Sequence, residues 1–252
     1  MPDLPLDIWA LAFGITLFAG FVKGAVGFAM PLIMVSGLGL IMDPRLAVAA
    51  IILPIVVSNL LQTFRTGPGP ALEAIRESWR FVLSVCVAIA IFAQFVPLID
   101  PRVFYFVLGI PVVLISVVQL VGWRPSIPQR HRVGAEWTAG IVSGVLGGLV
   151  GTWGPITVLY LIAVDMPKVR QMVVQGVIYG TGSVTLLFAH LASGLLDRST
   201  APMSALLILP GLAGMQVGLR FQDRLDQRLF TRVVLCVLFV SGLNLVWKGV
   251  SG

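Results

Sequence analysis

Two glycine-rich stretches of the chain contain residues that could bind a small anion. Residues 20–31 read GFVKGAVGFAMP, and residues 144–155 read GVLGGLVGTWGP. The shared positions are Gly20, Gly24, Gly27 and Pro31 in the first stretch and Gly144, Gly148, Gly151 and Pro155 in the second. Glycine allows a turn with positive φ and a close backbone approach, and proline suits the first turn of a following helix. Each stretch therefore predicts a tip followed by a helix N-terminus, where free N–H groups and the helix dipole favour an anion.

The side chains beside these tips have two interpretations each. Lys23, whose counterpart is Gly147, could neutralise a bound anion as a point charge, or its ammonium group could reach the membrane interface. Phe28 and Trp153 could line a small pocket, or they could pack against lipid or other helices. The glycines themselves could serve only to bring helices close together.

Uncharged polar residues elsewhere in apolar segments could donate hydrogen bonds to an oxyanion. Asn59, Thr152 and Gln175 are of this kind, and interhelical hydrogen bonding is their alternative role. His190 could carry a coupling proton, or it could be a structural, hydrogen-bonded histidine near a helix end. The predicted substrate-binding residues are Lys23, Gly24, Gly27, Phe28, Pro31, Asn59, Gly148, Gly151, Thr152, Trp153, Pro155 and Gln175.

Composition excludes several classes of protein. Hydrophobic residues make up 58% of the chain and charged residues 11%, against about a quarter charged in soluble domains. The net charge of +6 comes from basic residues in short loops rather than from a stripe on one face, so no nucleic-acid partner is expected. Cys86 and Cys236 are isolated, and the chain has no HExxH motif and no P-loop. We expect no metal ion, no cofactor and no enzymatic activity.

The hydropathy pattern predicts an all-α, polytopic membrane protein that forms one transmembrane domain over residues 1–252. The apolar segments lie at about 8–23, 28–42, 46–64, 80–98, 103–122, 137–150, 153–164, 171–194, 201–218 and 230–247. The first and second segments are short for a bilayer, and so are the sixth and seventh. Each short pair, joined by a glycine-rich tip, could cross the membrane twice or form a re-entrant hairpin, and the short lengths favour the hairpin.

The two halves of the chain predict an inverted repeat. A constant offset of 124 residues relates Gly20 to Gly144 and Pro31 to Pro155. Repeat one covers about 8–123 and repeat two about 137–248, with five helical segments each. Because five is odd, the second repeat would enter the membrane from the opposite side. Short, glycine- or proline-interrupted segments at matching places in two halves are a pointer to a transporter's binding site.

The distribution of basic residues predicts the orientation in the membrane. One set of loops holds Arg65, Arg76, Arg80, Arg124, Arg130, Arg132, Lys168, Arg170, Arg220, Arg224, Arg228 and Arg232, and the other holds Arg45, Arg102, Arg198 and Lys248. Cytoplasmic loops carry the excess of lysine and arginine. Both termini are therefore predicted to lie outside the cytoplasm.

The doubled GxxxGxxGxxxP pattern, the chain length and the charged turn after each second segment resemble the TauE/SafE sulfite-exporter family. The resemblance covers essentially the whole chain. It implies transport of a small anion such as sulfite, thiosulfate or an organosulfonate, across the inner membrane of a bacterium.

The leading hypothesis is a secondary transporter in which one half rocks against the other and the two tips bind the anion. A proton or counter-ion would have to accompany the anion if transport were electroneutral. One alternative is a passive anion channel, which would give large single-channel currents rather than counterflow exchange. Another is a membrane assembly factor without transport activity, for which no small anion would shift the thermal stability.

Overall fold

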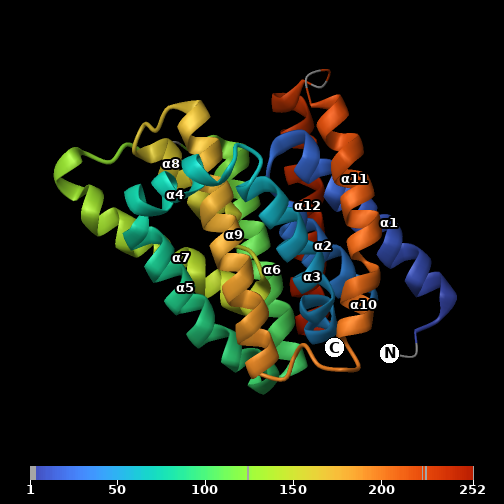
Figure 1. The fold of residues 1–252 in the computed structure, drawn as a ribbon. Coiled ribbons are helices and arrows are strands. Elements are labelled where there is room, and N and C mark those ends of the chain that lie inside the picture. Colours follow the sequence, from blue (N-terminus) through green and yellow to red (C-terminus); the bar gives the residue numbers. More distant parts are fainter. Residues whose placement is uncertain (1–3, 124, 223, 225, 252) are drawn as a thin grey trace. The chain divides into compact units, whose positions relative to one another are not determined.

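The computed structural model describes residues 4–123, 125–222, 224 and 226–251, without the side chains of residues 227 and 228. Arg124 and the side chain of Arg228, which contribute to the charge pattern above, lie outside this part. The helices are α1 (Leu6–Val26), α2 (Met30–Ile41), α3 (Pro44–Thr63), α4 (Pro68–Glu77), α5 (Trp79–Phe92), the 3₁₀ helix η1 (Ala93–Leu98), α6 (Pro101–Val121), the 3₁₀ helix η2 (Gln129–His131), α7 (Arg132–Val150), α8 (Gly154–Ala163), α9 (Lys168–Ala192), α10 (Ala201–Leu206), α11 (Ile208–Phe221) and α12 (Gln227–Ser251) (Figure 1). The all-α prediction is confirmed.

Within the described residues, eight helical stretches are long and apolar enough to cross a bilayer. They are Leu6–Val26, Pro44–Thr63, Trp79–Leu98, Pro101–Val121, Gln129–Val150, Lys168–Ala192, Ala201–Phe221 and Leu229–Ser251. Together with the shorter apolar helices α2 and α8, they account for the ten predicted segments. Large apolar side chains such as Leu114, Phe188 and Trp247 are more than half exposed, and such side chains are the ones that lipid would cover.

The prediction that both helices of each glycine-joined pair are short is wrong for the first helix. α1 has 21 residues and α7 has 19, because the helices continue through charged residues such as Lys23 and Glu136 at which the hydropathy falls. α2 has 12 residues and α8 has 10, so they are only about 18 and 15 Å long at 1.5 Å per residue. Each pair therefore combines a helix of spanning length with one that reaches about halfway across the 30 Å hydrocarbon core.

The amphipathic helix α4 lies where only a loop was expected. It begins directly after Gly67, which has a φ of +92°, and Pro68 occupies its first turn. Ala71 and Ala74 are buried, and α4 packs against α9. Arg170 at the start of α9 pairs with Glu77, at 2.6 Å from Nε to Oε2. The helix is too short and too polar to appear in a search for apolar segments.

Packing divides the chain into two compact units. Unit 1 contains Met1–Ile55, Pro97–Trp123 and Gly194–Gly252, and unit 2 contains Val56–Val96 and Arg124–Ser193. Each unit therefore includes helices from both predicted repeats.

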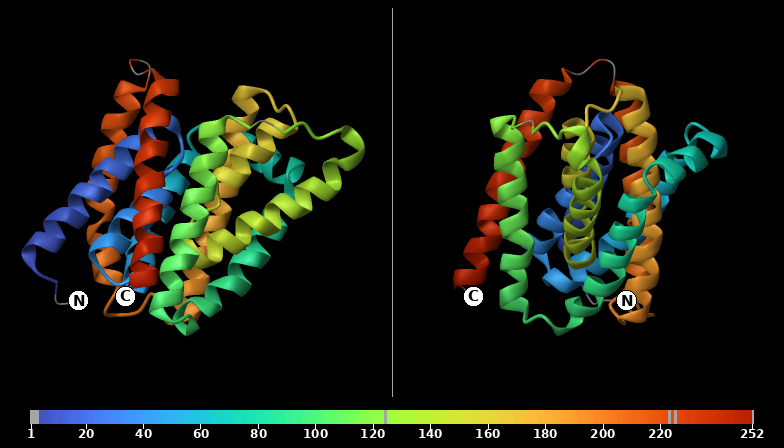
Figure 2. Two further views of the ribbon diagram at one scale, coloured as in Figure 1. Left: turned by 180° about the vertical axis from the view of Figure 1, so that it is seen from behind. Right: turned by 90° about the vertical axis from the view of Figure 1, so that its left-hand side faces the viewer.

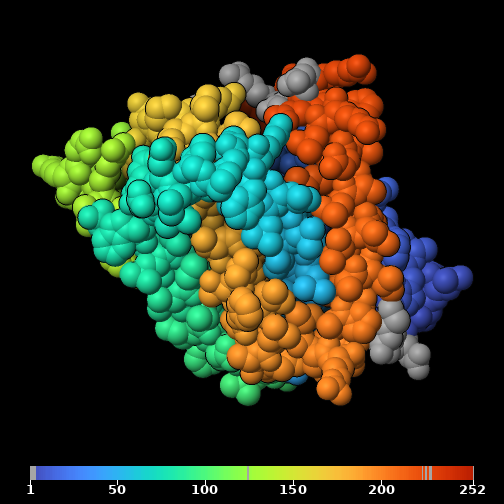
Figure 3. Space-filling view, in the orientation of Figure 1, coloured from blue at the N-terminus to red at the C-terminus, as the bar shows by residue number. Residues whose placement is uncertain are grey.

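In unit 1, α1 packs along α11 and α6 packs along α12 (Figure 2). The space-filling view shows α1, in blue, directly against α11, in orange (Figure 3). A β-carbon at Gly20 would overlap the carbonyl oxygen of Gly211, and one at Gly109 would lie 2.9 Å from the carbonyl oxygen of Gly242. Glycine at these positions permits contact between the helix backbones.

Several helices of unit 1 begin or end on the same side of this unit. The first turn of α1 and the last turn of α12 lie on this side (Figures 1 and 2). Lys248 Nζ donates to the carbonyl oxygen of Leu40, at 2.6 Å, and the Arg45 guanidinium donates to the carbonyl oxygen of Ile99. These cations therefore bond carbonyl groups at the ends of α2 and η1.

A proline interrupts α3 close to the point where the chain passes from unit 1 to unit 2. Pro54 has no N–H, so the carbonyl group of Ala50 loses its intrahelical partner. Ser204 of α10 is fully buried, donates from Oγ to Ala50 O at 3.0 Å and accepts from Leu53 N–H at 3.0 Å. One hydroxyl thus bonds both backbone groups beside the break, as neighbouring serines do for prolines in membrane helices.

In unit 2, α5 packs along α7, and α9 packs against α5 and α8. A β-carbon at Gly144 would lie 2.5 Å from Ala88 Cβ, and one at Gly148 would lie 2.8 Å from the backbone nitrogen of Ala93. The glycines of α7 therefore bring α5 into close contact, as those of α1 do for α11.

Candidate functional site

The second glycine-rich tip is a tight turn between α7 and α8. Gly151 caps α7 with a φ of +71°, and its N–H donates to Gly147 O at 2.9 Å. Thr152 and Trp153 follow and are buried, and α8 begins at Gly154 with Pro155 in its first turn. The predicted turn at Gly151 and the predicted helix start at Pro155 are therefore present.

The start of α8 lacks a side-chain cap. Its N-cap residue is Trp153, which gives no side-chain hydrogen bond to the first turn. The N–H groups of Gly154 and Ile156 belong to the first turn, where a helix supplies no acceptors, and Pro155 has no N–H. Thr152 is 1% exposed, and its Oγ1 has no hydrogen-bond partner among the described residues. A buried hydroxyl without a partner costs about 1–3 kcal/mol, so this group is one that a ligand could satisfy.

A hydrogen-bond network connects the first turn of α8 to α9 and α3. The Tyr179 hydroxyl accepts from Gln175 Nε2 and donates to Gly154 O, both at 3.1 Å. Asn59 Nδ2 donates to Tyr179 O at 3.2 Å, and Thr63 Oγ1 donates to Asn59 O at 2.8 Å. The predicted residues Asn59 and Gln175 thus meet at Tyr179, which sequence analysis missed. Its position four residues after Gln175 puts both on one face of α9, which is the signal that could have found it.

Trp153 packs inside unit 2. A β-carbon at Gly147 would lie 2.9 Å from Trp153 Cε3, and one at Gly182 would lie 3.2 Å from Cε2. The indole ring also makes an edge contact with the Tyr179 ring, at a centroid distance of 6.5 Å. The indole ring therefore packs between α7 and α9, and its role in lining a pocket stays a prediction.

The first tip has a different set of residues. Gly27 caps α1 with a φ of +85°, and its N–H donates to Lys23 O at 2.8 Å. Ala29, with a φ of +74°, precedes α2, and Pro31 lies in the first turn of that helix. Phe28 is half-buried and occupies the position that corresponds to Thr152. This tip therefore has no hydroxyl to match that of Thr152.

The Lys23 side chain lies inside the protein. Lys23 is only 3% exposed, although it belongs to a helix whose outer face is apolar. A buried lysine in a membrane segment marks a functional position by default, because a charge in that environment is costly. The alternative in which its ammonium group reaches the interface does not describe this structure.

Two of the predicted site glycines bring helices together. A β-carbon at Gly24 would lie 2.8 Å from the backbone nitrogen of Leu219, and one at Gly148 would lie 2.9 Å from the carbonyl oxygen of Ile89. Both glycines lie inside helices rather than at the tips. Lys23, Gly24, Gly27, Phe28 and Pro31 belong to unit 1, and Asn59, Gly148, Gly151, Thr152, Trp153, Pro155 and Gln175 belong to unit 2.

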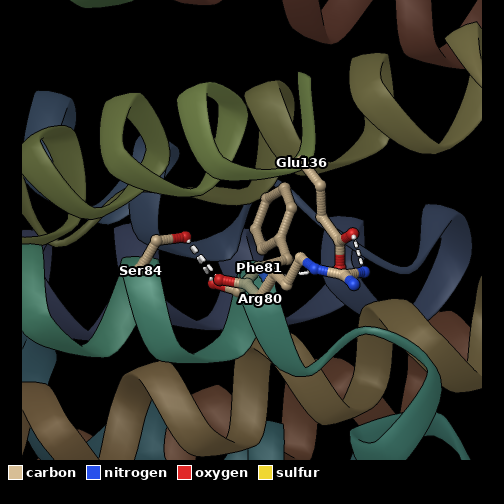
Figure 4. Close-up of polar contacts among 4 residues, drawn as sticks. All are labelled: Arg80, Phe81, Ser84 and Glu136. Atoms are coloured by element: carbon tan, nitrogen blue, oxygen red, sulfur yellow. Dashed lines mark hydrogen bonds and ion pairs between the residues drawn. The ribbon is translucent and has the colours of Figure 1, made fainter. Parts of the chain in front are cut away.

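Glu136 is a second buried polar residue that sequence analysis missed, because the sixth apolar segment was expected to begin one residue later. It accepts from Phe81 N–H at 3.4 Å and pairs with Arg80 Nη1 at 3.5 Å, while Ser84 Oγ donates to Arg80 O (Figure 4). Phe81 N–H belongs to the first turn of α5 and lacks an intrahelical acceptor. Glu136 therefore caps α5 from α7.

His190 lies in the last turn of α9 and is fully buried. Its Nδ1 lies 3.4 Å from Ser193 Oγ, and its Nε2 has no partner among the described residues. The contact with Ser193 favours the structural, hydrogen-bonded role over that of a proton carrier.

The model of the sulfite exporter TauE/SafE family matches residues 12–245. The chain belongs to this family. Nearly the whole chain is matched, from the second turn of α1 to the last part of α12, so the resemblance inferred from the two glycine motifs is confirmed. Neither a curated protein nor a solved structure matches the chain. TauE/SafE proteins are multi-pass membrane transporters, and the eight spans described above agree with that class.

Proposed function

We propose that this TauE/SafE protein is a secondary transporter that exports a small sulfur-containing oxyanion, such as sulfite, thiosulfate or an organosulfonate, and that the first turn of α8 binds the anion. The observation that carries the proposal is the buried Thr152 hydroxyl, which has no hydrogen-bond partner within the described part of the chain and directly precedes a helix start without a side-chain cap. Sulfur oxyanions have several acceptor oxygens and no ordinary donor. They complement a hydroxyl and two free N–H groups at the positive end of a helix dipole.

The site residues of unit 2 and the membrane potential both bear on the direction of transport. The hydrogen-bond network at the first turn of α8 contains the uncharged side chains of Asn59, Gln175 and Tyr179. Lys23, which is buried in unit 1, stays a predicted anion-binding residue of the first tip. A cytoplasm-negative membrane potential favours efflux of an anion by about 2.3 kcal/mol per charge at 100 mV. A uniporting exporter therefore needs no coupling ion, and a proton or counter-ion would be required only for electroneutral exchange.

We also propose the inverted repeat of five and five segments. Its support is that two helix pairs have matching contacts. A β-carbon at Gly24 would meet Met215 O and Leu219 N, and one at Gly148 would meet Ile89 O and Ala93 N. Gly24 and Gly148 are 124 residues apart. Met215 lies 126 residues after Ile89, and Leu219 lies 126 residues after Ala93. Since units 1 and 2 contain helices of both repeats, we infer that alternating access moves these units rather than the repeats.

The proposed orientation puts both termini on the periplasmic face of a bacterial inner membrane. In a Cys86→Ala/Cys236→Ala background, Leu6→Cys and Ser251→Cys will react with an impermeant thiol reagent added to intact spheroplasts. Arg76→Cys, on α4, will react only after the membrane is permeabilised. Labelling of Arg76→Cys in intact spheroplasts, or protection of either terminal cysteine, would contradict this orientation.

Substitution of Thr152 by valine tests the proposed site. We expect sulfite affinity to fall about 10- to 100-fold, because a hydrogen bond to a charged group contributes roughly 1.5–3 kcal/mol. The stability of the ligand-free protein should not fall, because the substitution removes a buried hydroxyl for which the described residues provide no partner. The measurements are the sulfite-dependent thermal shift and sulfite counterflow in proteoliposomes.

Thr157→Val is the matched control for Thr152→Val. Thr157 is also buried, but its Oγ1 donates to Trp153 O at 2.9 Å, so its hydroxyl already has a partner. We expect this variant to bind sulfite as the natural protein does. Unchanged affinity in Thr152→Val would remove the first turn of α8 from the proposed mechanism.

A further inference from the structure

Tyr179 contacts three helices that contribute to the proposed site in unit 2. It is 4% exposed and lies in the middle of α9. Its hydroxyl bonds Gln175 and the first residue of α8, its backbone carbonyl group accepts from Asn59 of α3, and its ring lies against Trp153. It thereby joins α3, α8 and α9 at one residue.

The hydrogen of the Tyr179 hydroxyl is already used. A phenol has one hydrogen to donate, and Tyr179 donates it to Gly154 O at 3.1 Å. The Gln175 amide donates to the same hydroxyl and sets its direction. The Tyr179 hydroxyl therefore has no hydrogen left to donate to an anion, and its effect on binding would pass through the two residues that it bonds, Gly154 and Gln175.

Gly154 leaves room for the Tyr179 hydroxyl because it has no side chain. A β-carbon there would lie 2.8 Å from Tyr179 Oη and 3.3 Å from Cζ. Any larger residue would push the hydroxyl away from the start of α8. Because Gly154 also supplies one of the free N–H groups, its placement decides whether that group and the Thr152 hydroxyl can reach the same anion.

We propose that Tyr179 is a positioning residue of the anion site, which holds the first turn of α8 against α9 and α3 so that its donors converge. The inference rests on the proposed function of α8. It predicts that loss of the Tyr179 hydroxyl weakens anion binding while leaving the translocation step largely intact, since preorganised donors bind without an ordering cost.

The first test is Tyr179→Phe, which keeps the ring contact with Trp153 and removes both hydroxyl hydrogen bonds. For sulfite transport in proteoliposomes, we expect KM to rise about fivefold and the maximal rate to change less than about twofold, in line with the modest net effect of a hydrogen bond. Tyr160→Phe is the matched control. Tyr160 packs its ring on Phe81, and no hydrogen bond of its hydroxyl occurs within the described residues. That variant should leave KM unchanged.

The second test is a double-mutant cycle with Gly154→Ala. In the natural background this substitution displaces the Tyr179 hydroxyl, so we expect it to raise KM. In the Tyr179→Phe background the hydroxyl is gone, and the added methyl group should raise KM no further. Such non-additivity is expected only when the two residues act through one contact.

The outcomes separate this inference from the proposed function. If Thr152→Val weakens sulfite binding but Tyr179→Phe leaves KM within twofold, the positioning role is overturned and the site stands. If Tyr179→Phe lowers only the yield of folded protein or the maximal rate, its role is structural and the inference is overturned. If neither Thr152→Val nor Tyr179→Phe changes KM, both the site and the inference fall.

Discussion

Replacement of Gly24 by alanine is expected to leave little stably folded protein, whereas the same replacement at Gly14 in the same helix is tolerated. A β-carbon at Gly24 would overlap the carbonyl oxygen of Met215 and lie 2.8 Å from Leu219 N, both in the backbone of α11. Backbone atoms cannot turn aside as a side chain can, so α1 and α11 would have to separate. Overpacking typically costs about 1–3 kcal/mol and occasionally more, and an overlap with backbone atoms belongs at the upper end of that range. The total stability of a typical domain is about 5–15 kcal/mol.

Gly14→Ala is the matched control, because among the described residues no atom outside the adjacent backbone of α1 lies within 4 Å of the position where its β-carbon would be. Alanine in a helix is favoured over glycine by about 0.5–1 kcal/mol, so this variant should be as stable as the natural protein or slightly more so. The measurements are the yield of monodisperse protein in detergent and the thermal midpoint. A Gly24→Ala protein with the natural midpoint would mean that α1 and α11 pack less closely than these distances indicate.

Replacement of Ser204 by alanine is expected to destabilise the protein by about 2 kcal/mol, because it leaves two buried backbone groups beside Pro54 without their partner. The carbonyl group of Ala50 and the N–H of Leu53 both bond Ser204 Oγ. The destabilisation caused by Ser204→Ala should depend on Pro54. In a Pro54→Ala background, the new N–H can bond Ala50 O, and Ser204→Ala should then cost about 1 kcal/mol less.

Ser116→Ala controls for the removal of a buried serine hydroxyl. Ser116 is fully buried in α6, and its Oγ donates to Val112 O at 2.7 Å within its own helix. That carbonyl group keeps its helical partner when the hydroxyl is removed, so we expect only a small loss. Thermal and denaturant unfolding of the four proteins in the Ser204–Pro54 cycle measure the coupling. If the changes in stability caused by Ser204→Ala and Pro54→Ala simply add in the double variant, Ser204 does not act on the break at Pro54.

The ten helical segments could be predicted because each depends on hydropathy averaged over about twenty neighbouring residues. Local hydropathy did not predict helical residues that are polar. α1 and α7 run on through Lys23 and Glu136, whose charged groups are buried by other parts of the chain. α4 was missed because only one of its faces is apolar, and its partner Arg170 lies about a hundred residues later in the chain.

The sequence by itself determined the number and the approximate limits of the apolar helices, the turns at Gly27 and Gly151, and the family. These features follow from local hydropathy, from the freedom of glycine at positive φ, and from motif spacing. Only the tertiary structure decided that Gly24 and Gly148 bring helices together and that Tyr179 joins Asn59 and Gln175 to α8. It also decided that the Thr152 hydroxyl has no partner among the residues that the structure describes. These properties depend on which backbone and side-chain atoms meet across more than a hundred residues of chain, and neither propensity nor spacing along the sequence specifies such contacts.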